Sequence, residues 1–156
     1  MINLNIGGFG KFNIEFAVFD YNGTLAKDGK LLPKVGDKLL NLSEKLSVHI
    51  LTADTFGKVR KNFASFPFEV QIINARNEIK QKAKFVEQLG AEKVVAFGNG
   101  HNDMEMLKTA AVGISVLESE AAYTKSIFTA DLCVRDICEG IDLLLNPLRL
   151  VASLRC

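Results

Sequence analysis

The sequence has few of the features that mark secreted, membrane-spanning or nucleic-acid-binding proteins. Lys and Arg total 19, Asp and Glu total 18, and the formal net charge is +1. This balance leaves no electrostatic footprint for nucleic acid or an acidic membrane surface. The first ten residues, MINLNIGGFG, lack the pattern of a signal peptide, and no segment reaches the roughly 18 apolar residues of a membrane span. We expect a soluble cytoplasmic protein that binds small molecules or proteins.

Cysteine is scarce as well. The chain has three cysteines, an odd number, and none of them shows a paired CxxC spacing. Neither a disulfide framework nor a zinc site is therefore expected. We predict three reduced thiols, with Cys133 in a core strand, Cys138 on a helix and Cys156 at the tail.

From Glu15 onward, short apolar runs alternate with amphipathic segments. The runs are AVFD, SVHILT, EVQII, KVVAF, GISV and DLCV. Between them lie helical stripes with spacings of three and four, namely Val35, Leu39, Leu42 and Leu46, and Ile137, Ile141 and Leu144. This alternation predicts an α/β fold, a Rossmann-like parallel sheet in three layers with helices on both faces. The chain shows no repeat or linker, so residues 1–156 are predicted to form one domain.

The two ends of the chain depart from this pattern. INLNI and KFNIEF flank a glycine-rich GGFG, which predicts a β-hairpin extension over residues 1–14. A phosphate-binding glycine loop is the alternative, but no helical pattern opens directly after Gly10. At the other end Pro147 opens a predicted short helix, whose apolar residues would pack on the sheet or on a second subunit: Leu148, Val151 and Leu154.

The segment AVFDYNGTLA, residues 17–26, carries the strongest chemical pattern. An apolar strand ends on Asp20 and breaks at once into Asn22, Gly23 and Thr24. Gly23 permits the positive φ of a tight loop, and the N–H groups after Asp20 can converge on an anion. This arrangement suits an Asp that attacks phosphorus. Asn22 stands two residues beyond Asp20, where a general acid/base carboxylate would be wanted, so that proton carrier is absent.

Three further segments are predicted to end near Asp20, because ligands of parallel sheets bind at the carboxyl ends of the strands. The strand in VHILTADT stops at Thr52, whose hydroxyl would project toward the anion. The alternative is a Thr that merely ends a strand, with Asp54 capping the next helix.

The helix IKQKAKFVEQL places one lysine on its apolar face. At about 100° per residue, Lys82 falls within the packed stripe, while Lys80 and Lys84 fall outside it as solvated charges. A lysine on a buried face either extends to solvent or meets an anion, and the nearby Asp favours the second. The residues that define the stripe are Ile79, Ala83, Val86 and Leu89.

The segment VVAFGNGHNDMEML reads as a strand, a glycine turn and a helix. Its glycines let the backbone approach a ligand, and Asn99 and Asp103 present oxygens suited to a hard cation, which predicts Mg²⁺. The alternative is a turn in which Asp103 only complements the helix dipole. His101 either faces solvent or supplies the missing proton. His49 lies in an apolar strand and is predicted to be a core residue.

Taken together, DYNGTL, a strand-terminal Thr, a helix lysine and GNGHND resemble the motifs of the haloacid dehalogenase superfamily, DxDGT, Ser or Thr, Lys, and GDGxxD. The resemblance covers residues 15–145, and within the superfamily it looks most like the small soluble P-type-ATPase-like proteins. It implies an aspartyl-phosphate on Asp20, with a catalytic set of Asp20, Asn22, Thr52 and Lys82. It further implies phosphate binding by Asn22, Gly23, Thr52, Ala53 and Lys82. The implied Mg²⁺ ligands are Asp20, the Asn22 backbone carbonyl, Asn99 and Asp103.

Two positions depart from the family motifs. Asn22 and Asn99 each replace an Asp, so Mg²⁺ should bind less tightly. A positioned acid/base contributes a factor of about 10² to 10⁴ to the rate. Because Asn22 cannot act as one, turnover should be slow. P-type ATPases also lack a carboxylate at the first of these positions. We predict a preference for leaving groups that are stable as anions, such as acyl phosphates, nucleoside polyphosphates and aryl phosphates.

The spacing of the motifs leaves no interval for a cap domain, because about one helix and one strand separate Thr24 from Thr52 and Thr52 from Lys82. The predicted site is therefore open, and a neighbouring subunit of a homo-oligomer could cover it. The alternative to a slow phosphatase is a phosphate-binding or phosphoprotein-binding regulatory module that kept the fold and lost efficient turnover.

Overall fold

The computed structural model describes residues 1–53, 59–118 and 120–156. Among these residues, six strands form a parallel sheet in the order β10-β9-β8-β3-β6-β7. The strands are β3 (Phe16–Asp20), β6 (Ser47–Thr52), β7 (Glu69–Ile72), β8 (Val94–Gly98), β9 (Val112–Val116) and β10 (Leu132–Val134). They match the apolar runs of the sequence, and the predicted α/β class is confirmed.

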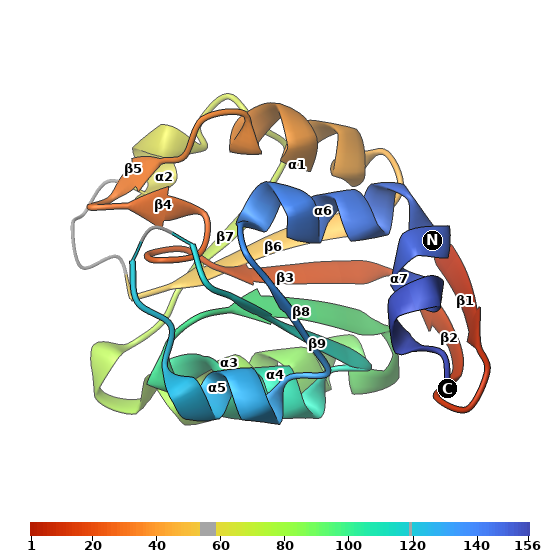
Figure 1. The fold of residues 1–156 in the computed structure, drawn as a ribbon. Helices are drawn as coiled ribbons and strands as arrows, with labels where there is room; N and C mark the ends of the chain where they lie inside the picture. Colours follow the sequence, from red (N-terminus) through yellow and green to blue (C-terminus); the bar gives the residue numbers. More distant parts are fainter. Residues whose placement is uncertain (54–58, 119) are drawn as a thin grey trace.

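Helices cover both faces of this sheet. Figure 1 shows α1 and α6 on one face and α3, α4 and α5 on the other. The helices are α1 (Val35–Ser43), α2 (Val59–Asn62), α3 (Glu78–Leu89), α4 (Met104–Thr109), α5 (Thr124–Thr129), α6 (Ile137–Leu145) and α7 (Pro147–Leu154). Short 3₁₀ turns add η1 (Ala75–Asn77), η2 (Ala91–Lys93) and η3 (His101–Asp103). The three predicted layers are therefore present.

The central strands are buried on both sides because they lie between the helical layers. Along β3, Ala17 and Phe19 pack into the cluster beneath α1 and α6, whereas Val18 packs into the cluster beneath α3 and α4. This alternation follows from the two-residue period of a strand. Phe19 stacks on Phe97 of β8 with ring centroids 4.6 Å apart, and this contact ties the two central strands together.

The N-terminal segment forms the predicted hairpin. Strands β1 (Ile2–Ile6) and β2 (Gly10–Ile14) pair antiparallel, and α7 packs against β1. In Figure 1 the hairpin and α7 lie together at one end of the sheet. Gly10 is the first residue of β2 and no helix opens after it, so the structure gives no support to the alternative of a phosphate-binding glycine loop.

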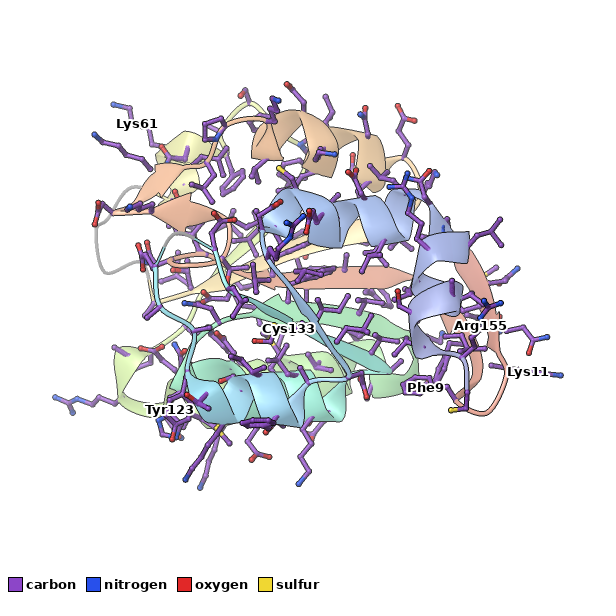
Figure 2. All side chains as sticks on the ribbon, viewed as in Figure 1. Phe9, Lys11, Lys61, Tyr123, Cys133 and Arg155 are labelled. Atoms are coloured by element: carbon purple, nitrogen blue, oxygen red, sulfur yellow. The ribbon has the colours of Figure 1, made fainter. Side chains whose placement is uncertain are left out.

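One prediction about an individual side chain is wrong, and another holds only in part. Leu148 is 83% exposed and does not pack on the sheet, because it lies about 200° around α7 from the buried Leu150. Its packing on a second subunit stays a prediction, while Leu154 is buried as expected. Cys133 is exposed rather than buried in the core, because β10 is an edge strand whose neighbours Leu132 and Val134 take the covered face. The three thiols are free, and Figure 2 labels Cys133.

The connections between the strands leave the carboxyl edge of the sheet open. From Leu25 to Leu51 the chain forms only a small hairpin, β4 (Ala26–Lys27) with β5 (Lys30–Leu31), followed by α1 and β6. No cap domain is inserted within the described part of the chain. Within that same part, no helix is both long and apolar enough to cross a lipid bilayer.

Candidate active site

The parallel register brings the predicted site residues to one edge of the sheet. Asp20, the last residue of β3, pairs with Leu51, so Thr52 stands one residue farther along β6. Strand β8 ends at Gly98, and Asn99 follows it directly. The carboxyl ends of β3, β6 and β8 therefore present Asp20, Thr52 and Asn99 side by side, as the motif order predicts.

Lys82 forms ion pairs with two acidic residues predicted to belong to the site. Its side chain is fully buried on α3, and its Nζ lies 2.6 Å from Oδ1 of Asp20 and 2.6 Å from Oδ1 of Asp103. The lysine therefore meets anions rather than solvent, as expected, whereas Lys80 and Lys84 are exposed. Charge-assisted hydrogen bonds of this kind are about twice as strong as neutral ones, so Lys82 holds both carboxylates in place.

Asp103 is held on its other side by the backbone. Its Oδ2 accepts hydrogen bonds from the N–H of Asn99 at 3.0 Å and of Gly100 at 2.8 Å. A Cβ at Gly98 would lie 2.5 Å from Cγ of Asp103, so only glycine allows this close approach. The carboxylate therefore does more than complement the dipole of α4, because it joins the turn after β8 to Lys82.

Thr24 lies between the nucleophile candidate and Asn99. Its buried hydroxyl is 3.3 Å from Oδ2 of Asp20 and 3.2 Å from Oδ1 of Asn99. A hydroxyl has one proton and can donate it to only one of these oxygens at a time. Asn99 Nδ2 donates to the carbonyl of Ala121 at 2.8 Å, which turns Oδ1 toward Thr24 and Asp20. Two oxygens thus converge on one point of the site.

The backbone of the loop after Asp20 differs from the prediction. The N–H of Gly23 donates to the carbonyl of Ala26 at 2.7 Å, and that of Thr24 donates to the carbonyl of Tyr21 at 3.3 Å. These donors serve the loop itself and are not directed at an anion. The expected positive φ of Gly23 is present, at 82°. Asn22 is half-buried, and its Oδ1 is buried with no hydrogen-bond partner among the described residues.

The charges in this site perturb one another strongly. Burial and the negative charge of Asp103 raise the pKa of Asp20 to about 7, against the opposing effect of the Lys82 ammonium. Burial alone would lower the pKa of Lys82, but the two carboxylates more than reverse this and raise it. Lys82 therefore stays charged, and Asp20 lies near the midpoint of its titration at neutral pH. A buried carboxyl in such a state is typical of an active site.

The donor set fits a hard divalent cation. Among the described residues no cluster of three or more His, Cys, Asp or Glu side chains is present, so any metal here relies on neutral oxygens as well. Asp20 Oδ2 and Asn99 Oδ1 both lie within 3.3 Å of the Thr24 hydroxyl, and the orphaned Asn22 Oδ1 lies on the same loop as Asp20. Oxygen ligands with few negative charges suit Mg²⁺, which keeps several of its waters.

The remaining candidates differ in how far they are buried. Thr52 is buried, Ala53 is half-buried beside it, and Asp54 lies outside the described residues. His101 is exposed, and its ring lies 4.9 Å from that of Tyr123, which Figure 2 labels at the start of α5. His49 is a core residue as predicted, with Nδ1 3.2 Å from Glu69 Oε2.

Sequence reasoning missed three groups that contact the site residues. The Thr24 hydroxyl was signalled by its place in DYNGT. The carbonyl of Ala121 and the hydroxyl of Ser126, which donates to the carbonyl of Gly100 at 2.6 Å, had no sequence signal. They lie more than 20 residues from their partners in the chain, and only the fold brings them together.

The comparisons with known proteins agree with this geometry. A family model for the haloacid dehalogenase-like hydrolases matches residues 51–127. A protein of Methanocaldococcus jannaschii, "Uncharacterized protein MJ0073", is 45% identical over 78 residues, which cover 47% of this chain and 84% of that protein. The chain belongs to the haloacid dehalogenase-like hydrolases.

Solved structures share the whole fold. The cobalt-bound deoxy-D-mannose-octulosonate 8-phosphate phosphatase (YrbI) of Haemophilus influenzae superposes with a TM-score of 0.71 at 16% identity, covering 86% of this chain and 88% of that one. The 3-deoxy-D-manno-octulosonate 8-phosphate phosphatase of Moraxella catarrhalis, in complex with magnesium, phosphate and KDO, gives a TM-score of 0.68 at 15% identity, covering 91% and 94%. At these identities the likeness shows a shared fold.

Proposed function

We propose that this protein is a magnesium-dependent phosphatase that acts through an aspartyl-phosphate on Asp20. The observation that carries the proposal is the buried Lys82 ammonium, 2.6 Å from both Asp20 and Asp103 at the open edge of the sheet. The phosphatases of similar fold, one of them bound to magnesium and phosphate, support the same conclusion.

The chemistry follows from charge. An Asp20 oxygen attacks phosphorus, the bond from phosphorus to the leaving oxygen breaks, and water later hydrolyses the acyl phosphate to restore the carboxylate. Lys82 lowers the pKa of Asp20, which favours the ionised carboxylate that attacks, and it neutralises negative charge on the phosphoryl group. Thr52, the last residue of β6, and Ala53, which follows it, would bind the phosphoryl oxygens.

Asp20, Asn99 and the backbone carbonyl of Asn22 would hold Mg²⁺, with Asp103 as the fourth predicted ligand. When bound, the ion supplies positive charge that stabilises the phosphoryl oxygens. Both oxygens of Asp103 already accept hydrogen bonds, from Lys82 on one side and from two N–H groups on the other. Its principal task is therefore to position Lys82 and the turn at Asn99.

Asn22 sets the rate and the substrate preference in this proposal. A carboxamide cannot protonate a leaving group, so turnover is slow and favours acyl, aryl and nucleoside polyphosphates over alkyl phosphates. The second candidate function is a phosphate-binding or phosphoprotein-binding regulatory module. What favours it is that both Asn22 and Asn99 are uncharged, so that turnover is impaired while the phosphate site remains.

One experiment separates the two functions. The protein is incubated with an aryl phosphate and Mg²⁺, then examined by mass spectrometry for an adduct on Asp20 and by a colorimetric assay for released phosphate. The phosphatase predicts release that is lost in Asp20→Ala and kept in Asp37→Ala, a matched change on the exposed face of α1. If neither an adduct nor released phosphate were detected, that result would favour the binding module. Equal turnover of aryl and alkyl phosphates would contradict the role assigned to Asn22.

A further inference from the structure

The turn that carries Asn99 is attached to a distant part of the chain, residues 121–126, which we call the anchoring segment. Three hydrogen bonds connect them: Asn99 Nδ2 to the carbonyl of Ala121 at 2.8 Å, Tyr123 N–H to the carbonyl of Asn99 at 2.8 Å, and Ser126 Oγ to the carbonyl of Gly100 at 2.6 Å. The anchoring segment thus holds both the side chain and the backbone of Asn99.

The bond to Ala121 decides which way the Asn99 carboxamide faces. A backbone carbonyl only accepts hydrogen bonds, so the atom opposite it must be a donor. Nδ2 therefore points to Ala121, and Oδ1 points to the Thr24 hydroxyl beside Asp20. An aspartate at position 99 would place a carboxylate oxygen against the Ala121 carbonyl, and two acceptors there would repel each other.

Ser126 holds the same turn one residue later. Ser126 is fully buried in the first turn of α5, and its hydroxyl donates a short hydrogen bond to the carbonyl of Gly100. The N–H of Gly100 in turn donates to Asp103. Hydrogen bonds therefore hold the turn on two sides, one from Asp103 and the other from the anchoring segment. Groups that orient metal ligands in this way have large effects on metal affinity although they never touch the metal.

We propose that Ser126 and the carbonyl of Ala121 are positioning groups for Asn99, and that this chain requires an amide donor at position 99. Asn99 is then not a weakened aspartate but the residue that the anchoring segment demands. The part that concerns Mg²⁺ rests on the proposed function. The orientation of the carboxamide does not, so the two can fail separately.

The first test compares Ser126→Ala with Ser115→Ala. Ser115 is an equally buried serine on β9, paired with Gly98, and its Oγ has no hydrogen-bond partner among the described residues. We expect Ser126→Ala to weaken Mg²⁺ binding, measured by calorimetry, by about 10-fold, and Ser115→Ala to change it less than about 2-fold. Equal Mg²⁺ affinities in the two variants would overturn the role of Ser126.

The second test needs no metal. In nuclear magnetic resonance spectra of the metal-free protein, the Asn99 carboxamide protons should exchange slowly with solvent, and they should exchange about 10-fold faster in Ser126→Ala but not in Ser115→Ala. Asn99→Asp should lower Tm by about 3 °C or more at pH 8 without metal. Rapid exchange in the wild type, or an unchanged Tm in Asn99→Asp, would overturn the proposal. The wild-type protein could bind no Mg²⁺ and still show slow exchange of the carboxamide protons. That result would refute the proposed Mg²⁺ site and support the positioning role.

Discussion

Replacing Lys82 by methionine should show how much the stability of the fold depends on the positive charge at the centre of the site. Methionine keeps the unbranched shape and removes the ammonium, which lies 2.6 Å from Asp20 and from Asp103. Coulomb's law at an effective dielectric constant of about 20 gives about 6 kcal/mol for each contact, most of which desolvation cancels. Breaking such a buried pair costs about 3 to 5 kcal/mol, because the remaining carboxylates face each other without a counter-charge. We expect Lys82→Met to lose that much stability.

The loss should depend on pH. Lys82 lowers the pKa of Asp20, so in the variant this pKa rises above about 7. A carboxyl whose folded pKa is raised above its unfolded pKa gives stability below the unfolded pKa, and this stability is lost as the pH rises through the folded pKa. Lys82 itself stays charged up to higher pH, because its pKa is raised. The stability difference between wild type and Lys82→Met should therefore be smallest near pH 5 and grow above pH 7.

The assay is urea unfolding in metal-free buffer at pH 5, 7 and 9. Lys80→Met, on the exposed side of the same helix, is the matched control and should change stability by less than about 0.5 kcal/mol. The double variant Lys82→Met/Asp103→Asn should cost less than the sum of the single changes, since neutralising Asp103 relieves the repulsion. A Lys82→Met protein within about 1 kcal/mol of wild type at pH 9, or a deficit that is the same at every pH, would refute this reasoning.

Three further predictions concern other parts of the chain. Asn22→Asp should raise turnover of an alkyl phosphate by about 100-fold or more in a phosphate-release assay, and an unchanged rate would mean that position 22 has been misjudged. Gly98→Ala should cost about 1 to 3 kcal/mol in urea unfolding, because a Cβ would lie 2.5 Å from Asp103 Cγ; wild-type stability would contradict this close approach. Burial lowers the pKa of His49, partly opposed by Glu69, so its stabilising contribution is present above about pH 6.5 and is lost as the pH falls. His49→Phe should therefore flatten the loss of stability between pH 7 and pH 5, and an unaltered slope would assign that loss to other groups.

The fold could be predicted from the sequence because hydrophobic periodicity is a local property. The stripe at Ile137, Ile141 and Leu144 is buried on α6, and each of the apolar runs forms a strand. The same reasoning placed Lys82 on a buried face before any partner was known. Cys133 was misplaced, and Leu148 does not reach the sheet, because exposure depends on what covers an edge strand or a helix end, and no local pattern records that cover.

The sequence by itself therefore determined the layers, the placement of the motifs at strand ends and the residue types of the site, since each follows from periodicity or from a short motif. Tertiary structure decided which atoms meet: that Lys82 bridges Asp20 and Asp103, that the N–H of Gly23 serves its own loop, and that the Asn99 carboxamide faces Ala121. The physical reason is that hydrogen bonds and ion pairs require their two atoms to lie about 3 Å apart, to within a few tenths of an ångström, and only the packed fold fixes such distances between groups far apart in the chain.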